Sequence, residues 1–339
     1  MTAAVRIALA EGAQRLAAAG VEGGRAQARW LLAAALGLDA AGLARLAPDA
    51  EVPAPALAGY RGLIARRAAR EPLQHLLGTA PFRTLTLAVG PGVFVPRFET
   101  ESLVQLVLDR APAGPVAAVD LGSGSGAIAL ALAAERPHWT VTAVERSAAA
   151  LPWLRRNAAA ALGDSLDGGR LRIVEGDFAD PGLLAEWHDR VHVVVGNPPY
   201  VPTATPVDPE VRADPAEAVF AGADGLGAIA ALLPLACALL RPGALSAMAD
   251  MPMGSMGMGG AHMHHEGQDA AAPLRSGLNA ALAGHHTSEG ETAMLSLLML
   301  AAPTLYQLEP PAHSHAPFVE LPTAALHPWP PPERPPRPA

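Results

Sequence analysis

Lysine is absent from this chain of 339 residues, so all 24 basic residues are arginine. We attribute this bias to genome composition rather than to chemistry. The one cysteine, Cys237, excludes an intrachain disulfide framework and is typical of a reducing compartment. No apolar run reaches the roughly 18 residues that a membrane-spanning helix needs, and the N-terminus lacks a basic-then-apolar signal segment. The sequence therefore predicts a cytoplasmic protein with no membrane association.

The charge balance is acidic. The chain carries 32 Asp and Glu residues and a formal net charge of −8, and no basic patch dominates it. This balance argues against a nucleic-acid substrate, so we expect contact with nucleic acid only indirectly. The length leaves room for about two or three domains.

The most informative segment is Asn197-Pro198-Pro199-Tyr200, which directly follows an apolar run at residues 191–196. A β-branched run bounded by glycine predicts a buried strand, and two prolines prevent a strand or helix from continuing. In open α/β sheets, ligands bind at the carboxyl ends of strands. A rigid loop there, with an Asn oxygen, bare carbonyls and an aromatic ring, suits a planar –NH2 group. An ordinary proline turn remains the alternative for the tetrapeptide alone.

A glycine-rich turn follows an earlier predicted strand at residues 116–121, which includes Asp120. The turn consists of Gly122, Ser123, Gly124, Ser125 and Gly126. Glycine lets the backbone approach a ligand closely, and a helix beginning near Gly126 offers unpaired N–H groups to a carboxylate or phosphate. The spacing differs from the G-x-G-x-x-G dinucleotide fingerprint, and the turn alone is a weak signal.

Two further predicted strands lead to acidic residues. Residues 140–144 lead to Glu145, close to the expected position of a carboxylate that binds ribose hydroxyls. Residues 171–174 lead towards Asp177 and Phe178, which are candidates to accept from an exocyclic amine and to stack on a purine. Each acidic residue alone could be a solvated strand end. Their arrival at successive strand ends favours a nucleoside-containing ligand.

Together with three further stretches, these motifs resemble the class I S-adenosylmethionine-dependent methyltransferases. More narrowly, they resemble the HemK-type family, which methylates the side-chain amide nitrogen of a glutamine in peptide chain release factors. The further stretches are residues 71–78, 95–101 and 211–226, and the resemblance covers about residues 1–244. It implies S-adenosylmethionine as cofactor, a class 1 release factor as protein substrate, and the glutamine of its Gly-Gly-Gln motif as target.

The expected site has two parts. The residues expected to be catalytic are Asn197, Pro198, Pro199 and Tyr200. The residues expected to bind the cofactor are Asp120, Gly122, Ser123, Gly124, Ser125, Gly126, Glu145, Asp177, Phe178 and Asn197. We hypothesise that the Asn197 side-chain oxygen and the Pro198 carbonyl accept hydrogen bonds from the substrate –NH2, while Tyr200 packs against its amide plane. No metal is expected.

The expected fold class is α/β, a Rossmann-like class I methyltransferase sheet with a small N-terminal helical domain. Its expected parts are a substrate-recognition domain of four short helices (1–78), a linking β-hairpin (79–95), an S-adenosylmethionine-binding catalytic domain (96–248) and an atypical tail (249–339). Within the catalytic domain we expect Glu99 or Thr100 to cap a helix and residues 211–223 to form an irregular acidic loop. A helix at 229–240 and a fifth strand at 243–247 should follow.

The tail differs in composition from the rest of the chain. Eight of nine methionines and eight of twelve histidines follow residue 245. A frameshifted or rearranged end, a partly disordered proline-rich extension and a soft-metal site compete as explanations. The metal explanation ranks last because no rigid ligand spacing accompanies these residues.

Two alternative functions remain open. One is an amino-group methyltransferase acting on adenine or guanine, which would have to extract the base from its stack. The other is a cofactor-binding but catalytically impaired relative whose sheet lacks its closing strands. The fold alone does not separate these functions from release factor methylation.

Overall fold

The computed structural model describes residues 2–163 and 169–241. These residues divide into two compact units, residues 2–69 and residues 70–241. The expected strand at 243–247 and the tail at 249–339 lie outside the described residues, so the three explanations for the tail stay as they were.

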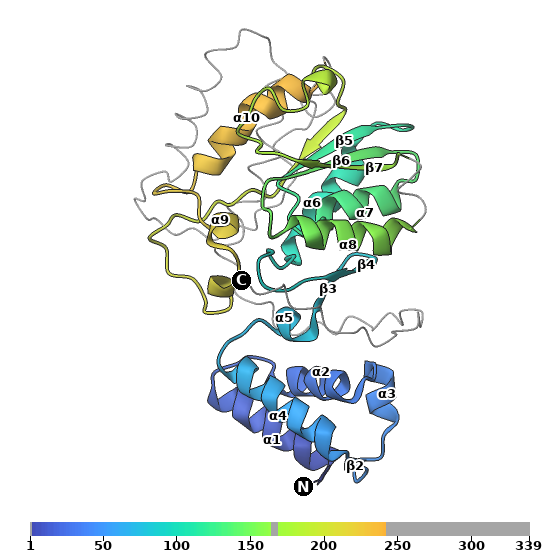
Figure 1. The fold of residues 1–339 in the computed structure, drawn as a ribbon, viewed down its shortest axis with the longest axis vertical. Helices are drawn as coiled ribbons and strands as arrows, with labels where there is room; N and C mark the ends of the chain where they lie inside the picture. The colour runs from blue at the N-terminus through green and yellow to red at the C-terminus, as the bar shows by residue number, and fades with distance from the viewer. Residues whose placement is uncertain (1, 164–168, 242–339) are drawn as a thin grey trace, which may run out of the picture. The chain divides into compact units, whose positions relative to one another are not determined.

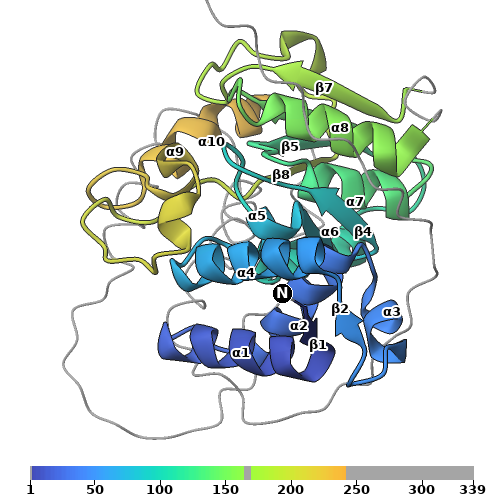
Figure 2. The same ribbon diagram turned by 60° about the horizontal axis from the view of Figure 1, so that its bottom comes forward.

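The N-terminal unit is helical, as expected. Its elements are β1 (Ala3–Ala4), α1 (Val5–Ala18), α2 (Gly24–Leu36), α3 (Ala40–Arg45), β2 (Glu51–Val52) and α4 (Ala54–Ala68). Helices α1, α2 and α4 pack together around buried Leu16, Leu31 and Leu57 (Figures 1 and 2). Buried Tyr60 donates its hydroxyl hydrogen bond to the Ala8 carbonyl over 3.1 Å. The antiparallel pairing of β1 with β2 was not expected from the sequence.

The second unit alternates strands and helices. Its elements are α5 (Leu73–Leu77), β3 (Thr79–Phe82), β4 (Leu85–Ala88), α6 (Glu99–Arg110), β5 (Ala117–Leu121), α7 (Ala127–Glu135), β6 (Thr140–Glu145), α8 (Leu151–Leu162), β7 (Leu171–Glu175), η2 (Ala185–Trp187), β8 (Val193–Val195), η3 (Val211–Ala213), α9 (Ala216–Val219) and α10 (Gly227–Leu239). Strands β3 and β4 form the predicted antiparallel hairpin.

The described sheet has four parallel strands in the order β7-β6-β5-β8. In register, Val119 of β5 lies opposite Thr142 of β6 on one side and Val194 of β8 on the other. The chain builds outwards from β5 through β6 to β7 and then returns to the other side of β5. Such a reversal of direction separates the loops at the strand ends and creates a ligand crevice. The Rossmann-like α/β class is confirmed.

Alternation along β5 buries both faces of the sheet. Ala118 packs into a core formed with α6, α7 and α8, whereas Val119 and Leu121 pack into a second core under α10. Figure 1 shows α7 and α8 on one face and α10 on the other. The period of two in the strand places Asp120 on the α7 face, beside Ala118.

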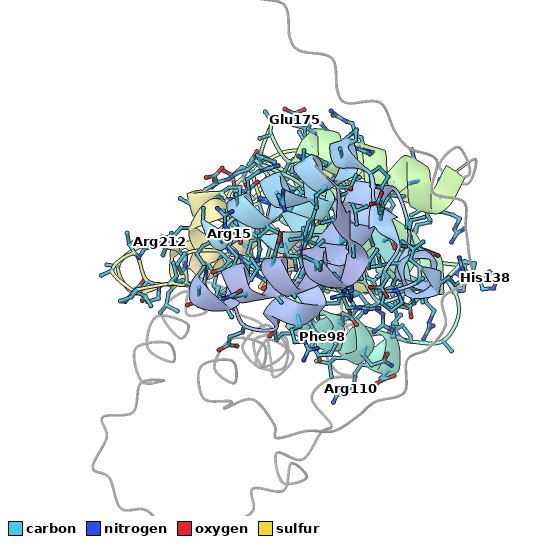
Figure 3. The ribbon with its side chains drawn as sticks, turned by 90° about the horizontal axis from the view of Figure 1, so that it is seen from below. Arg15, Phe98, Arg110, His138, Glu175 and Arg212 are labelled. Atoms are coloured by element: carbon cyan, nitrogen blue, oxygen red, sulfur yellow. The ribbon has the colours of Figure 1, made fainter. Side chains whose placement is uncertain are left out.

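Two local expectations are wrong. The N-cap of α6 is Phe98, and no side chain caps this helix, so neither Glu99 nor Thr100 has the predicted capping role. Phe98 and Arg110, labelled in Figure 3, mark the two ends of α6. The carboxylates of Glu99 and Glu101 instead lie in the first turn, where they favour the helix dipole. Residues 211–223 are only partly irregular, because they contain η3 and α9.

No helix within residues 2–163 and 169–241 combines the length and the apolarity that crossing a bilayer requires.

Candidate active site

A cavity of about 430 Å³ opens at the carboxyl ends of the four strands. Its wall comes from six segments that are distant in sequence. These are residues 92–100 before and at the start of α6, 122–128 after β5, 144–150 at the end of β6, 176–179 after β7, 197–199 after β8, and 215–231 around α9 and the start of α10. The cavity therefore lies at the edge where the sequence places its candidate residues.

Most of the predicted site residues are brought together here. Those that line the cavity are Gly122, Ser123, Gly124, Ser125, Glu145, Asp177, Phe178, Asn197, Pro198 and Pro199. Among the described residues, Asp120, Gly126 and Tyr200 do not form part of this wall. Asp120 is buried, Gly126 is the N-cap of α7, and the half-buried Tyr200 packs against the core under α10.

The turn after β5 depends on glycine. Gly122, Gly124 and Gly126 have φ values of 81°, 56° and 88°, in the left-handed region that other residues rarely adopt. The turn leads directly into α7, whose first two residues, Ala127 and Ile128, line the cavity. Because the first N–H groups of a helix lack intrahelical acceptors, this wall favours an anionic group.

Asp120 supports the turn from below. Its side chain is fully buried, and Oδ2 accepts a hydrogen bond from the Ala129 N–H over 3.2 Å. Within the described residues, Oδ1 has no hydrogen-bond partner. Burial raises the pKa of Asp120 to about 7, although hydrogen bonds from Ser123 and Ala129 act in the opposite direction. The carboxyl group therefore holds its proton far more tightly than an exposed aspartate does.

Glu145 ends β6 with a fixed carboxylate. Oε2 accepts from the Gly124 N–H and Oε1 accepts from the Ser147 N–H, each over 2.7 Å. A carboxylate offers about four lone-pair positions, so each oxygen retains one for a ligand. Glu145 thus joins the glycine turn to the end of the neighbouring strand and still presents acceptors to the cavity.

Asp177 and Phe178 form the wall beyond β7. Asp177 Oδ1 accepts from the Ala179 N–H over 2.9 Å, and Oδ2 pairs with Arg146 over 2.9 Å. The Ala179 hydrogen bond, followed by Arg146, lowers the pKa of Asp177, so this carboxylate is ionised at neutral pH. The Phe178 ring lies so close to the turn that a Cβ on Gly122 would be 3.4 Å from its Cε1 atom.

Asn197 faces this wall from the end of β8. Its Nδ2 donates a hydrogen bond to Thr100 Oγ1, in the first turn of α6, over 3.2 Å. The preceding residue must be glycine, because a Cβ on Gly196 would lie 2.6 Å from the Leu121 carbonyl oxygen of β5. The backbones of β5 and β8 therefore approach closely where Asn197 leaves the sheet.

An ion pair that the sequence did not reveal joins two walls of the cavity. Asp214 is fully buried, pairs with Arg97, and accepts the Val95 N–H over 3.0 Å. Their neighbours Pro96 and Pro215 both line the cavity. Burial raises the pKa of Asp214, and Arg97 opposes that shift. The two segments were separately recognised in the sequence, but a pairing across 117 residues leaves no local signal.

Asn157 was also missed, although the sequence carries a signal for it. It lies on α8 and is buried, and its Nδ2 donates to the carbonyls of Ser125 and Ala88 over 2.9 and 3.0 Å. Its Oδ1 accepts the Ala88 N–H over 2.7 Å. A polar residue on the same helical face as Leu154 and Ala158 is unusual. Asn157 connects the β-hairpin to the glycine turn.

Among the residues that the structure describes, no three His, Cys, Asp or Glu side chains are grouped so as to hold a metal ion.

Comparison with known proteins identifies the family. Residues 8–78 match the family model of the PrmC N-terminal domain, and residues 85–212 match that of the methyltransferase small domain. A release factor glutamine methyltransferase of Mycolicibacterium smegmatis is 45% identical over 241 residues, covering 70% of this chain and 82% of that protein. The corresponding protein of Streptomyces coelicolor is 46% identical, covering 69% and 80%. That of Geobacter sulfurreducens is 43% identical, covering 67% and 77%. The resemblance read from the motifs is thus confirmed, and the chain belongs to the release factor glutamine methyltransferase family.

Proposed function

We propose that this protein transfers a methyl group from S-adenosylmethionine to the side-chain amide nitrogen of the glutamine in the Gly-Gly-Gln motif of a class 1 peptide chain release factor. The observation that carries this proposal is the position of Asn197 and Pro198. They project from a rigid strand end into the cavity that the glycine turn and Glu145 also line. The names of the relatives support the same substrate.

The residues present fit this cofactor. The positive-φ glycines leave the wall of the turn without side chains, and the start of α7 suits the carboxylate of an amino-acid moiety. The remaining lone pairs of Glu145 suit ribose hydroxyls, and the Phe178 ring offers an apolar face to a purine. When bound, S-adenosylmethionine supplies an electrophilic methyl group on a sulfonium centre. We assign its binding to the turn at Gly122–Gly126, Glu145, Asp177 and Phe178, with Asp120 supporting the turn.

Asn197 and Pro198 orient the nucleophile. An amide nitrogen attacks poorly because its lone pair is delocalised into the carbonyl. Asn197 Oδ1 and the Pro198 carbonyl each accept a hydrogen bond from the substrate –NH2, which fixes the nitrogen and favours a pyramidal, positively charged transition state. The fixed φ angles of Pro198 and Pro199 keep these acceptors in place, and such alignment supplies several powers of ten in rate.

The proposal assigns no strong general base. The proton on the nitrogen becomes acidic once the new N–C bond forms, so it leaves to solvent without assistance from a tuned side chain. It also assigns no substrate contact to Tyr200, since that ring packs against the core under α10. Substrate recognition is assigned to residues 1–78, linkage to 79–95, and cofactor binding and catalysis to 96–248.

The test uses the full-length protein, labelled S-adenosylmethionine and a purified class 1 release factor. We expect methyl incorporation into the release factor, and none when its Gly-Gly-Gln glutamine is replaced. In Asn197→Ala, turnover should fall by about 10²- to 10³-fold, the usual effect of removing one catalytic hydrogen-bonding group.

Binding of S-adenosylhomocysteine to Asn197→Ala, measured by calorimetry, is the control and should match the wild type. Turnover of this variant at the wild-type rate would refute the role of Asn197. Methylation of a nucleic acid in place of the release factor would refute the proposed substrate.

A further inference from the structure

We propose that Thr100 is a positioning residue for methyl transfer, which holds the Asn197 amide with its oxygen towards the substrate. Thr100 has no contact with the reacting atoms in this proposal and acts through Asn197. The inference rests on the proposed function, because it concerns the orientation of the amide that binds the substrate –NH2.

The geometry places one hydroxyl beside one amide. Asn197 Nδ2 lies 3.2 Å from Thr100 Oγ1, and both residues line the cavity although 97 positions separate them. In the described part of the chain, this is the one hydrogen bond that the Asn197 side chain makes. With Nδ2 turned to Thr100, the opposite end of the amide, Oδ1, is left for a ligand.

The orientation matters because the two ends of an asparagine amide have opposite hydrogen-bonding character. Oδ1 accepts, whereas Nδ2 donates. The –NH2 group of a glutamine donates, so a flipped Asn197 would oppose donor to donor at the nitrogen that must react. A hydroxyl can either donate or accept, so Thr100 does not forbid the flip. It gives the productive orientation a partner for an N–H that would otherwise be buried and unpaired.

The Thr100 hydroxyl is available for this bond because α6 begins without a side-chain cap. Its position is also fixed. The neighbouring Glu101 carboxylate accepts the Arg83 N–H over 3.0 Å, and the Arg83 guanidinium binds both oxygens of Glu135 on α7. The hairpin turn, the start of α6 and the end of α7 are thereby connected, and two fork-like hydrogen bonds to a carboxylate restrict geometry strongly.

A matched pair of substitutions separates positioning from simple structural support. Thr100→Val keeps the shape of the side chain but removes the acceptor, whereas Thr100→Ser keeps the acceptor and removes a methyl group. Steady-state methylation of the release factor should show kcat about three- to tenfold lower in Thr100→Val, the effect of one hydrogen bond. KM for the release factor and the Kd of S-adenosylhomocysteine should stay within about twofold. Thr100→Ser should restore kcat.

A second measurement does not need turnover. The side-chain amide signals of Asn197, identified by their loss in Asn197→Asp, are followed by NMR. In the wild type and in Thr100→Ser we expect slow exchange of the Nδ2 hydrogens with water, and in Thr100→Val faster exchange. Thermal melting verifies that each variant is folded, and Thr100→Ala replaces Thr100→Val if the latter does not fold.

The outcomes distinguish the two levels of the argument. Wild-type kcat in Thr100→Val, or equal impairment in Thr100→Ser, would overturn the positioning role while leaving release factor methylation intact. If the wild type did not methylate a release factor, the proposed function would fail. The NMR comparison would then still decide whether Thr100 fixes the Asn197 amide, with unchanged exchange in Thr100→Val counting against it.

Discussion

At the scale of single residues, Asp120 combines complete burial with one hydrogen bond to its carboxylate and one oxygen without a partner. Its position is set by the alternation of β5, which turns it towards α7 rather than into the cavity. An ionised carboxylate in such surroundings is destabilised, because burial removes the water that would solvate it. The support of the glycine turn is therefore sensitive to pH.

Replacing Asp120 should change the pH dependence of stability. The pKa is 3.8 for an ordinary aspartate and about 7 in the folded protein. Between these values the folded state retains a proton that the unfolded state has lost, so the free energy of unfolding falls as the pH rises from about 4 to about 7. Asp120→Asn lacks this dependence. We expect its melting temperature relative to the wild type to rise between pH 5 and pH 8; a constant difference over that range would contradict the assignment.

At the scale of elements, the site depends on contacts between segments that follow different strands. The Arg97–Asp214 pair joins the segment before α6 to the loop before α9. Breaking a buried pair from one side leaves an uncompensated charge, whereas replacing both members is much less costly.

Arg97→Met should therefore lower the free energy of unfolding by roughly 3–5 kcal/mol, because it leaves Asp214 buried without its counter-ion. Adding Asp214→Asn should recover a large part of this loss, since an Asn oxygen still accepts the Val95 N–H without carrying a charge. Urea unfolding of the wild type, both single variants and the double variant measures the coupling. Additive losses in the double variant would show that the pair is not coupled.

The sequence predicted elements and strand ends well, for a physical reason. Continuous apolar runs such as residues 116–121 and 191–196 are characteristic of buried parallel strands, and their carboxyl ends must share one edge of the sheet. Glu145, Asp177 and Asn197 could therefore be expected at one cavity before the structure was known. The hairpin at 79–88 was predictable from its alternation for the same local reason.

What the sequence could not predict depends on long-range contacts. Thr100 was expected to cap α6, but its hydroxyl binds Asn197, because the fold places the end of β8 beside the first turn of this helix. The ring of Tyr200 was expected on the substrate side and packs against the core under α10. Each residue had an adequate local explanation, and tertiary contacts determined its actual position.

At the scale of the whole molecule, the cavity gathers segments spread over residues 92–231, and the described core is complete on both faces of the four strands. A ligand in this cavity contacts parts of the chain that have no sequence proximity. Binding should therefore stabilise all of these segments together rather than one loop alone.

Hydrogen exchange tests this expectation. Saturating S-adenosylhomocysteine should increase the protection of amides in peptides covering residues 122–128, 144–150, 176–179 and 197–199. Glu145→Ala at the same ligand concentration is the control and should lose most of this protection, because the carboxylate assigned to the ribose is missing. Protection confined to one of these peptides in the wild type would contradict a single shared site.

The position of Pro198 directly after Asn197 has a chemical consequence for the lifetime of the enzyme. Asparagine usually ages when the backbone nitrogen of the next residue attacks its side-chain carbonyl carbon, closes a cyclic imide and releases ammonia. In this chain that nitrogen belongs to a proline, which carries no hydrogen and cannot close the ring. The amide to which we assign substrate binding is thus protected against conversion to aspartate by this route, in a loop that faces an open cavity.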